Sequence, residues 1–489
     1  MQITTLKRVA SRYFFCCSSL YLLVLSGCLV GPDYHKTSFV VPTDWGQHSE
    51  QVSKEPVALP GWWRRLNDPV LNELVNYAIS GNNSVAVAKA RVREARAGVG
   101  QVTGSLAPSL SGSIAGSRSS EMFVNQYRGG FDAVWEIDLF GGRQRAIEAA
   151  GYGYDGTVED LRATMVILLG EVAKNYVEVR GWQQKLFIVR KISSSHYKTF
   201  ALIRKKLAAG EVSELDVSNA QAQMVNTDAD ILQMEAALSM SIHRLSVLTG
   251  RVPTALENLL QQSAKEAKIP QPEWPIPAGI PADILLTRPD LRRAERQYAQ
   301  ATARIGQREA DHYPSFSLSG NISTAATEIG QLGKNSTIGW SFGPSLRLPL
   351  FNGGQVMASV EVARAQRDQA FITYRAAVLQ ALEEVENALV GLAKEHERLK
   401  KITAANAAYL RSWKLSQSLF ESGNTSFLEL LNANRSYYSS QMALADSHVA
   451  LVAQYIALMK ALGGGWDGMV DVSRPEVVDG VTHSHTKVD

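Results

Sequence analysis

The chain has 489 residues, a formal net charge of +3 at pH 7 and three cysteines. Its sequence holds no basic cluster with interleaved aromatic residues, so its charge does not indicate nucleic-acid binding. Cys16 and Cys17 fall in a predicted signal segment and Cys28 at its end, so the mature chain offers neither a disulfide pair nor a cysteine-based zinc site.

Residues 1–27 have the layout of a secretion signal. Lys7, Arg8 and Arg12 precede an apolar stretch that ends in Leu25-Ser26-Gly27-Cys28. This ending resembles a bacterial lipobox, in which the cysteine carries the lipid and becomes the first mature residue. An ordinary signal peptide followed by a chance cysteine is the alternative. We predict a lipoprotein signal at 1–27 with lipid on Cys28, and leucine rather than aspartate after it favours, by resemblance, the outer membrane.

Prolines predict an extended, lipid-anchored segment over residues 28–60. A helical stretch follows from Pro69 to about Gly100. Beyond the signal we find no run of 18 apolar residues, so we expect no transmembrane helix.

Two pairs of strands are predicted, at about 106–118 with 127–139 and at about 314–324 with 337–350. Apolar residues such as Phe131, Trp135 and Trp340 alternate there with small or polar ones. The strands are about as long as the ~9–11 residues that cross a bilayer at a tilt, and the aromatic residues suit an interfacial girdle. A soluble sandwich is the alternative.

Four membrane strands cannot close a barrel, because known barrels start at about eight strands. Two copies would give eight strands and three would give twelve. A barrel of eight strands fills its interior with side chains, so a function that needs a passage favours three copies.

The chain repeats itself at a fixed offset of 213 positions. The segment from Leu207 to Ala220 matches the segment from Phe420 to Ala433, which pairs Gly210 with Gly423. We therefore predict two pseudo-repeats, at 61–250 and 282–464, with a proline-rich linker at 251–281 and a flexible tail at 465–489.

Each repeat contains a very long helix that leads to a hairpin tip. No proline interrupts the stretches from Arg143 to about Ala208 and from Gln355 to about Glu421, and apolar residues follow a coiled-coil-like spacing. A helix of ~65 residues at ~1.5 Å per residue is roughly 100 Å long. Such a length suits a structure that crosses an aqueous compartment.

The sequence carries no recognisable catalytic motif. It has no His-Glu-x-x-His, no phosphate-binding loop and no Gly-x-Ser-x-Gly. We therefore expect no enzymatic activity, no bound metal and no cofactor apart from the covalent lipid.

Several short motifs, in this order and spacing, resemble one known family. They are Cys28-Leu29-Val30-Gly31-Pro32-Asp33-Tyr34, Trp62-Trp63, Asn67-Asp68-Pro69, Arg288-Pro289-Asp290, Tyr313-Pro314-Ser315 and Pro349-Leu350-Phe351. They are similar to the TolC-like outer-membrane factor family, in its lipoprotein branch of NodT type, over nearly the whole chain.

The resemblance implies a mixed α/β membrane protein. Three identical chains would form a twelve-stranded transmembrane barrel on a periplasmic tunnel of α-helical coiled coils. This passive duct would take substrate from an inner-membrane transporter, of the proton-driven RND type, through a periplasmic adaptor.

The resemblance also implies a ring of acidic residues at the periplasmic entrance. The matching positions are Asp216 and Glu429, which would give six carboxylates in a trimer and could hold divalent cations. Asn219 and Asn432 occupy the second tier, where some members have another acid. The alternative role of the two acids is to stabilise the helix dipole from the first turn.

The tips themselves are expected to turn the chain and, by resemblance, to meet the adaptor. Gly210 and Gly423 allow left-handed turns, and Ser213 and Asn424 lie beside them. The resulting hypothesis is an export duct for drugs or other small toxic molecules. The alternatives are the outer duct of a type I protein secretion system and a structural envelope lipoprotein without a channel.

Overall fold

The computed structural model describes residues 29–46, 52–53, 55, 59–118, 124–262, 268–466 and 471–473. The signal at 1–27, Cys28 and most of the predicted tail lie outside these residues. The chain forms two compact units: unit 1 takes Met1–Ser38, Arg91–Val158 and Arg293–Ala376, and unit 2 takes the rest. Each unit therefore combines segments of both predicted repeats, instead of following the repeats along the chain.

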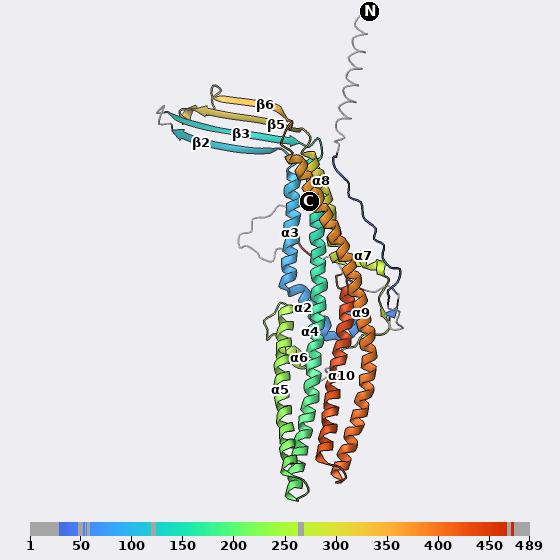
Figure 1. Ribbon diagram of the computed structural model, residues 1–489. Helices are drawn as coiled ribbons and strands as arrows, with labels where there is room; N and C mark the ends of the chain where they lie inside the picture. Colours follow the sequence, from blue (N-terminus) through green and yellow to red (C-terminus); the bar gives the residue numbers. More distant parts are fainter. Residues whose placement is uncertain are drawn as a thin grey trace, which may run out of the picture. The chain divides into compact units, whose positions relative to one another are not determined.

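Unit 1 contains a four-stranded antiparallel sheet (Figure 1). Its strands are β2 (Ser109–Arg118), β3 (Asn125–Ile137), β5 (Ser315–Ala326) and β6 (Ile338–Arg347), in the order β2-β3-β5-β6. The two predicted strand pairs are thus joined through β3 and β5. The predicted extension of the last strand to residue 350 is wrong, because β6 ends at Arg347 and Pro349 cannot donate to a ladder.

The register of the sheet separates apolar from polar side chains. Ile322 is paired with Phe131 on one side and with Trp340 on the other. The next row joins Asp132 to Ser111 and Asn321. Because paired residues share a face and successive residues alternate, the sheet has one apolar face and one polar face rich in small residues. Trp340 is 77% exposed, so the chain itself does not cover its apolar face there.

The two outer strands of this sheet each have a single partner in the described part of the chain. β2 pairs only with β3 and β6 pairs only with β5. Each outer strand therefore presents a row of unpaired backbone N–H and C=O groups.

Asn82 breaks the helical stretch that the sequence predicted as one. α2 (Pro69–Gly81) ends before it and α3 (Asn83–Gly104) begins after it. The Asn82 side chain accepts hydrogen bonds from the backbone N–H groups of Ser84 and Val85, at 2.8 and 3.2 Å, and donates to the Leu248 carbonyl at 2.9 Å. Within unit 2, this buried asparagine thus caps the start of α3 and ties it to the end of α5.

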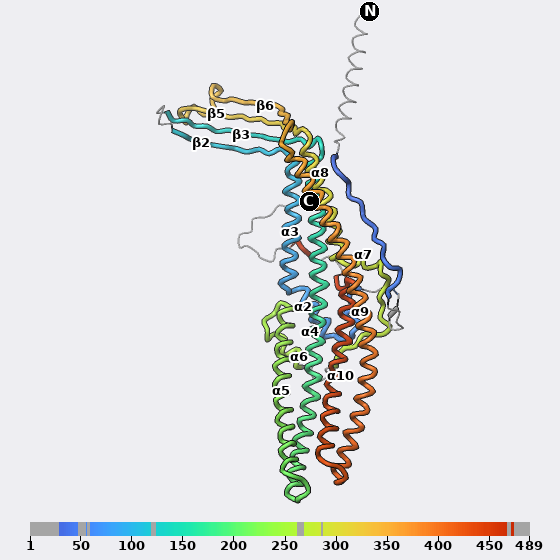
Figure 2. Tube along the Cα trace, in the orientation of Figure 1, coloured from blue at the N-terminus to red at the C-terminus, as the bar shows by residue number. Residues whose placement is uncertain are grey.

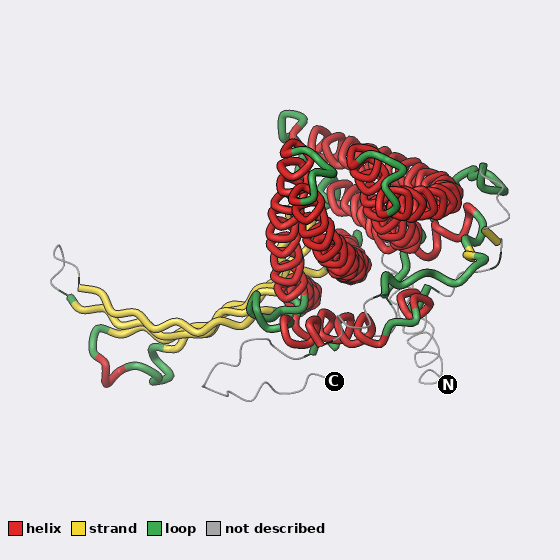
Figure 3. Tube along the Cα trace, turned by 90° about the horizontal axis from the view of Figure 1, so that it is seen from below, coloured by secondary structure: helices red, strands yellow, loops and turns green. Residues whose placement is uncertain are grey.

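Four long helices form two hairpins (Figure 2). α4 (Gly142–Ala208) and α9 (Gln355–Glu421) each have 67 residues, and α5 (Glu214–Leu248) and α10 (Phe427–Ala461) each have 35. In unit 2 their helical segments pack side by side, as Figure 3 shows from below. The equal lengths agree with the constant offset of 213 positions.

The sequence predicted no transmembrane helix. By length and composition alone, however, α10 is apolar enough to be a candidate for crossing a membrane. Its most apolar window is 44% buried in the structure. Leu451, Tyr455 and Leu458 are among its fully buried residues. The apolar character of α10 therefore serves packing within unit 2.

The predicted linker is more structured than its prolines indicated. It contains α6 (Glu257–Gln262) and β4 (Ile276–Pro277), and β4 pairs in parallel with β1 (Val52–Ser53). The short elements η3 (Pro281–Asp283) and α7 (Ile284–Thr287) then lead to α8 (Pro289–Ala310), while η1 (Trp62–Leu66) precedes α2 and η4 (Ile329–Gln331) connects β5 to β6.

The predicted tail also begins too early. Trp466 donates from its indole N–H to the Thr287 carbonyl at 3.1 Å. The guanidinium groups of Arg162 and Arg292 lie 4.6 and 5.5 Å from its ring centroid. These cation–π contacts hold Trp466 in place within unit 2.

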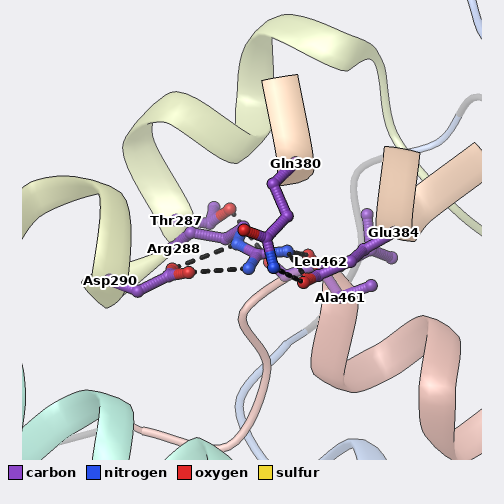
Figure 4. Close-up of polar contacts among 7 residues, drawn as sticks. All are labelled: Thr287, Arg288, Asp290, Gln380, Glu384, Ala461 and Leu462. Carbon is purple, nitrogen blue, oxygen red and sulfur yellow. Dashed lines mark hydrogen bonds and ion pairs between the residues drawn. The ribbon is translucent and has the colours of Figure 1, made fainter. Parts of the chain in front are cut away.

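A buried arginine joins three helices of unit 2 just before α8 (Figure 4). Arg288 is 7% exposed. It donates to both carboxylate oxygens of Asp290 at 3.0 and 2.7 Å, to Glu384 of α9 at 2.7 Å and to the Ala461 carbonyl of α10 at 2.9 Å. The burial of Asp290 acts to raise the pKa of its carboxyl, but the Arg288 bonds and charge outweigh burial and lower that pKa. The group is therefore an ionised cluster at a helix junction.

We predict that Arg288→Met destabilises the protein by about 2–3 kcal/mol. This loss is smaller than for a fully buried pair because Asp290 and Glu384 remain partly exposed. Urea unfolding of the detergent-solubilised protein, followed by circular dichroism, measures it. Arg190→Met, which removes an exposed ion pair with Glu235 in the same unit, is the control and should cost less than 1 kcal/mol. Equal losses in both variants would contradict the role of Arg288.

Candidate functional site at the helical hairpin tips

Both hairpin tips turn with the same backbone motif. At the end of α4, the N–H of Glu211 donates to the Lys206 carbonyl at 2.9 Å and that of Gly210 to the Leu207 carbonyl at 2.9 Å. At the end of α9, Asn424 and Gly423 make the equivalent bonds, to Leu419 at 2.8 Å and to Phe420 at 3.2 Å. This pattern is a Schellman motif, which needs a left-handed residue after the helix.

The left-handed residue is a glycine in both tips. Gly210 and Gly423 each have φ of 76°. No atom lies within 4 Å of where a Cβ would be placed on either one. Backbone conformation, and not space, is therefore what favours glycine at these positions.

The helices that leave the tips begin with serine caps. Ser213 accepts a hydrogen bond from the Asp216 N–H at 3.3 Å, and the Asp216 carboxylate accepts from the Ser213 N–H and hydroxyl at 3.0 and 2.7 Å. Ser426 accepts from the Glu429 N–H at 3.3 Å. Asp216 thus completes a capping box, whereas the Glu429 side chain is exposed. The sequence analysis did not single out Ser426, although the offset of 213 pairs it with Ser213.

Asn219 and Asn432 lie one helical turn after the two acids. Asn219 is half-buried and Asn432 is exposed. Each shares a helix face with the acid three residues before it. Within one chain, then, the acid and the asparagine form two short polar rows, one on α5 and one on α10.

An apolar cluster holds the two tips together. It consists of Ile203, Val217, Ala220, Phe420, Phe427, Leu430 and Leu431, which come from all four long helices. The rings of Phe420 and Phe427 lie 5.9 Å apart across the second tip, and the Lys206 ammonium lies 5.3 Å from the Phe420 ring centroid. The tips therefore form one packed body with polar residues on its outside.

Polar contacts continue between α5 and α10 above the tips. Arg435 donates to the Gln223 side-chain carbonyl at 3.1 Å, and the Tyr438 hydroxyl donates to Asp230 at 3.4 Å. Arg435 and Tyr438 stand at a coiled-coil-like spacing along α10, where apolar residues are usual. Their long side chains instead end in hydrogen bonds between the two hairpins.

One buried histidine lies beside these contacts. His196 of α4 is 4% exposed, and its Nδ1 is 2.9 Å from the Thr227 hydroxyl. Burial lowers the pKa of His196 and outweighs the influence of the nearby Asn434 side chain and of the Asp228 charge, which both raise it. The folded protein therefore favours the neutral ring. Within the described ranges, no group of three or more His, Cys, Asp or Glu residues is arranged to hold a metal ion.

Comparison with known proteins identifies the family. The family model described as outer membrane efflux protein matches residues 74–251 and 280–464. The chain belongs to the outer membrane efflux protein family. It is 33% identical over 457 residues to nodulation protein T of Rhizobium leguminosarum bv. trifolii. The matched region covers 91% of this chain and 96% of that protein.

Two further relatives cover nearly the whole chain. The toluene efflux pump outer membrane protein TtgI of Pseudomonas putida is 30% identical over 464 residues, covering 91% of this chain and 97% of that protein. The solved structure of the outer-membrane channel OprN superposes with a TM-score of 0.79 at 32% identity, covering 90% of this chain and 100% of that one. This chain therefore shares the fold of the outer-membrane channel OprN.

We predict that His196 makes the protein less stable in acid. In the unfolded chain histidine has its ordinary pKa of about 6.5, so below this pH the unfolded state binds more protons than the folded state. The free energy of unfolding should fall between pH 7 and pH 5, by up to ~1.4 kcal/mol per pH unit for this group. His196→Gln should reduce that fall, as measured by urea unfolding at each pH. His243→Gln, which removes a histidine of the same unit whose side chain is 43% exposed, is the control, and an undiminished fall in His196→Gln would contradict the prediction.

Proposed function

We propose that three copies of this chain form an outer-membrane export duct. The observation that carries this proposal is the sheet of unit 1, which has one apolar face, one polar face and two open edges. Only a closed barrel satisfies the backbone of such a sheet in lipid. Along the order β2-β3-β5-β6 every pairing is antiparallel, so β6 of one copy is oriented to pair antiparallel with β2 of the next.

Three copies would close a twelve-stranded barrel with its apolar face toward lipid. The polar face, with small residues such as Ser111 and Ser341, would then line a lumen wide enough for a passage. The two hairpins of each copy would contribute six hairpins to a periplasmic tunnel. The equal helix lengths support this pseudo-symmetric arrangement, because they bring all six tips to comparable depth.

The duct is proposed to work passively within a tripartite efflux system. An inner-membrane pump, of the proton-driven RND type, would deliver small toxic molecules through a periplasmic adaptor that contacts the tips at Gly210, Ser213, Gly423 and Asn424. The family membership and the toluene pump named for one relative support small-molecule export. A protein secretion duct and a structural lipoprotein are the competing functions.

Two further features complete the proposal. Asp216 and Glu429 of three copies would form the acidic ring at the entrance, with Asn219 and Asn432 as an uncharged second tier. Asp216 would keep its capping role, since an ionised carboxylate both caps a helix and attracts cations. Lipid on Cys28 would anchor each copy to the outer membrane.

Site-specific photo-crosslinking in cells tests which partner the tips meet. A crosslinker at Ser213 or Asn424, followed by mass spectrometry, should capture the adaptor of a proton-driven pump. The same crosslinker at Lys400, which is exposed on α9 well away from the tip, is the matched control and should not. Capture of the adaptor of an ATP-driven protein exporter would establish secretion instead. Capture of the chain's own subunits alone would favour the structural lipoprotein.

The acidic ring predicts block of the channel by divalent cations. In planar bilayers, the double variant Asp216→Asn with Glu429→Gln should raise the Mg²⁺ concentration for half-maximal block by about tenfold, equivalent to ~1.4 kcal/mol. Glu397→Gln, which removes an exposed carboxylate of α9 paired with Lys400, should leave the block unchanged. If the double variant is blocked as before but loses stability, the two acids act only in stabilising the first helical turn.

A further inference from the structure

The segment that follows Cys28 is docked onto unit 1. We call residues Leu29–Tyr34 the N-terminal strap. The Val30 N–H donates to the Phe140 carbonyl at 3.2 Å. Arg145, in the first turn of α4, donates from Nε to the Val30 carbonyl and from Nη2 to the Gly31 carbonyl, both at 3.1 Å. The first part of the strap, at Val30 and Gly31, is therefore bound through its backbone.

Arg145 is enclosed by its partners. Its side chain is 2% exposed and also reaches Asp33 of the strap and Glu148 of α4, each at 2.7 Å. A buried guanidinium is tolerated when carboxylates and carbonyls satisfy its donors. Arg145 donates to the carbonyls of Val30 and Gly31 and to the carboxylates of Asp33 and Glu148. The first three of these acceptors belong to the strap, so the arginine is placed to hold it.

Both ends of the strap fit closely against unit 1. A Cβ on Gly306 of α8 would lie 2.7 Å from the Val30 carbonyl oxygen and 2.9 Å from Cγ and Nε of Arg145, so a larger residue there would displace the strap or the arginine that holds it. At the other end, the Tyr34 hydroxyl donates to Glu295 at 2.8 Å. The Tyr34 ring makes edge contacts with Tyr152 and Tyr298, with centroids 5.8 and 5.6 Å apart.

The strap begins where the strands of unit 1 meet its helices. Phe140, which binds Val30, lies between the end of β3 and the start of α4. Its ring stacks at 4.7 Å on Tyr313, which lies between α8 and β5. In the proposed duct this junction is the periplasmic boundary of the membrane, where aromatic residues gather.

We propose that Arg145 is a positioning residue that clasps the N-terminal strap and fixes the lipid anchor at the strand-to-helix junction. This inference rests on the proposed lipidation of Cys28. One residue spans at most ~3.6 Å. The attachment point of an acyl group one residue before Leu29 can therefore move only a short distance from the strap. The anchor is then held close to the strand-to-helix junction of its own chain, and it does not act as a long flexible tether.

Hydrogen–deuterium exchange of the full-length, membrane-extracted protein tests the clasp. Arg145→Met should accelerate exchange in peptides covering residues 29–36 at least tenfold, and Arg145→Lys should have a smaller effect. Peptides from β5 and β6 report whether the sheet stays folded. Arg364→Met is the matched control, because it removes an arginine of unit 1 that is 51% exposed and paired with Glu309. Unchanged exchange of the strap in Arg145→Met would overturn the proposal.

A second variant keeps the test decisive if Arg145→Met unfolds the sheet. Gly306→Ala inserts one methyl group beneath the Val30 carbonyl and should also free the strap. Gly151→Ala, in the part of α4 that belongs to unit 1 and with no atom within 4 Å of its Cβ position, is its control. If Gly306→Ala leaves the strap as protected as Gly151→Ala does, the clasp is refuted.

The lipid itself is measured separately. The mass of the N-terminal peptide reports whether Cys28 is acylated, and a Cys28→Ala protein exported with a cleavable signal should keep a protected strap. A missing acyl group with a protected strap would overturn the lipid anchor and leave the Arg145 clasp standing. An acylated Cys28 with an unprotected strap would overturn the clasp alone.

Discussion

The unpaired edges of the four-stranded sheet are the constraint on which the rest of this structure depends. An edge strand that lies in lipid without a neighbouring strand leaves several backbone N–H and C=O groups without hydrogen bonds. Each such group costs several kcal/mol. The chain also gathers its apolar side chains on one face of this sheet, as in the paired row of Phe131, Ile322 and Trp340. A sheet of this kind is incomplete by itself, and the proposed trimer is the smallest assembly that both satisfies the edges and leaves a passage.

The helical part depends on buried polar groups at its junctions as much as on its apolar seams. Asn82 ends one helix while capping the next, and Arg288 connects the start of α8 to α9 and α10. Such groups specify where a helix stops and which helix it contacts. A buried polar group without a hydrogen-bond partner would lower the stability of the folded state, so alternative arrangements are disfavoured. The apolar cluster at the tips has no such requirement and tolerates repacking more readily.

Much of this architecture could be predicted from local patterns. The alternation around Phe131 and Trp340 located the strands, the long proline-free stretches located α4 and α9, and Gly210 and Gly423 located the tips. The sequence analysis missed what depends on contacts between distant segments. Arg145 binds Val30 across 115 positions, and Trp466 binds Thr287 across 179. No local period records such a contact, and the tip residue Ser426 was overlooked although the repeat offset pointed to it.

The two tips share a backbone but not a sequence. The residues after the turn are Glu211-Val212-Ser213 in one and Asn424-Thr425-Ser426 in the other. In the proposed trimer these tips would alternate around the entrance, so identical adaptor subunits would meet two different chemical surfaces of one shape. Such quasi-equivalent binding can rest only on what the tips have in common, namely the glycine turn and the serine cap. The residues that differ would then distinguish one docking position from the other. The surface that the entrance offers to the adaptor would have threefold rather than sixfold symmetry.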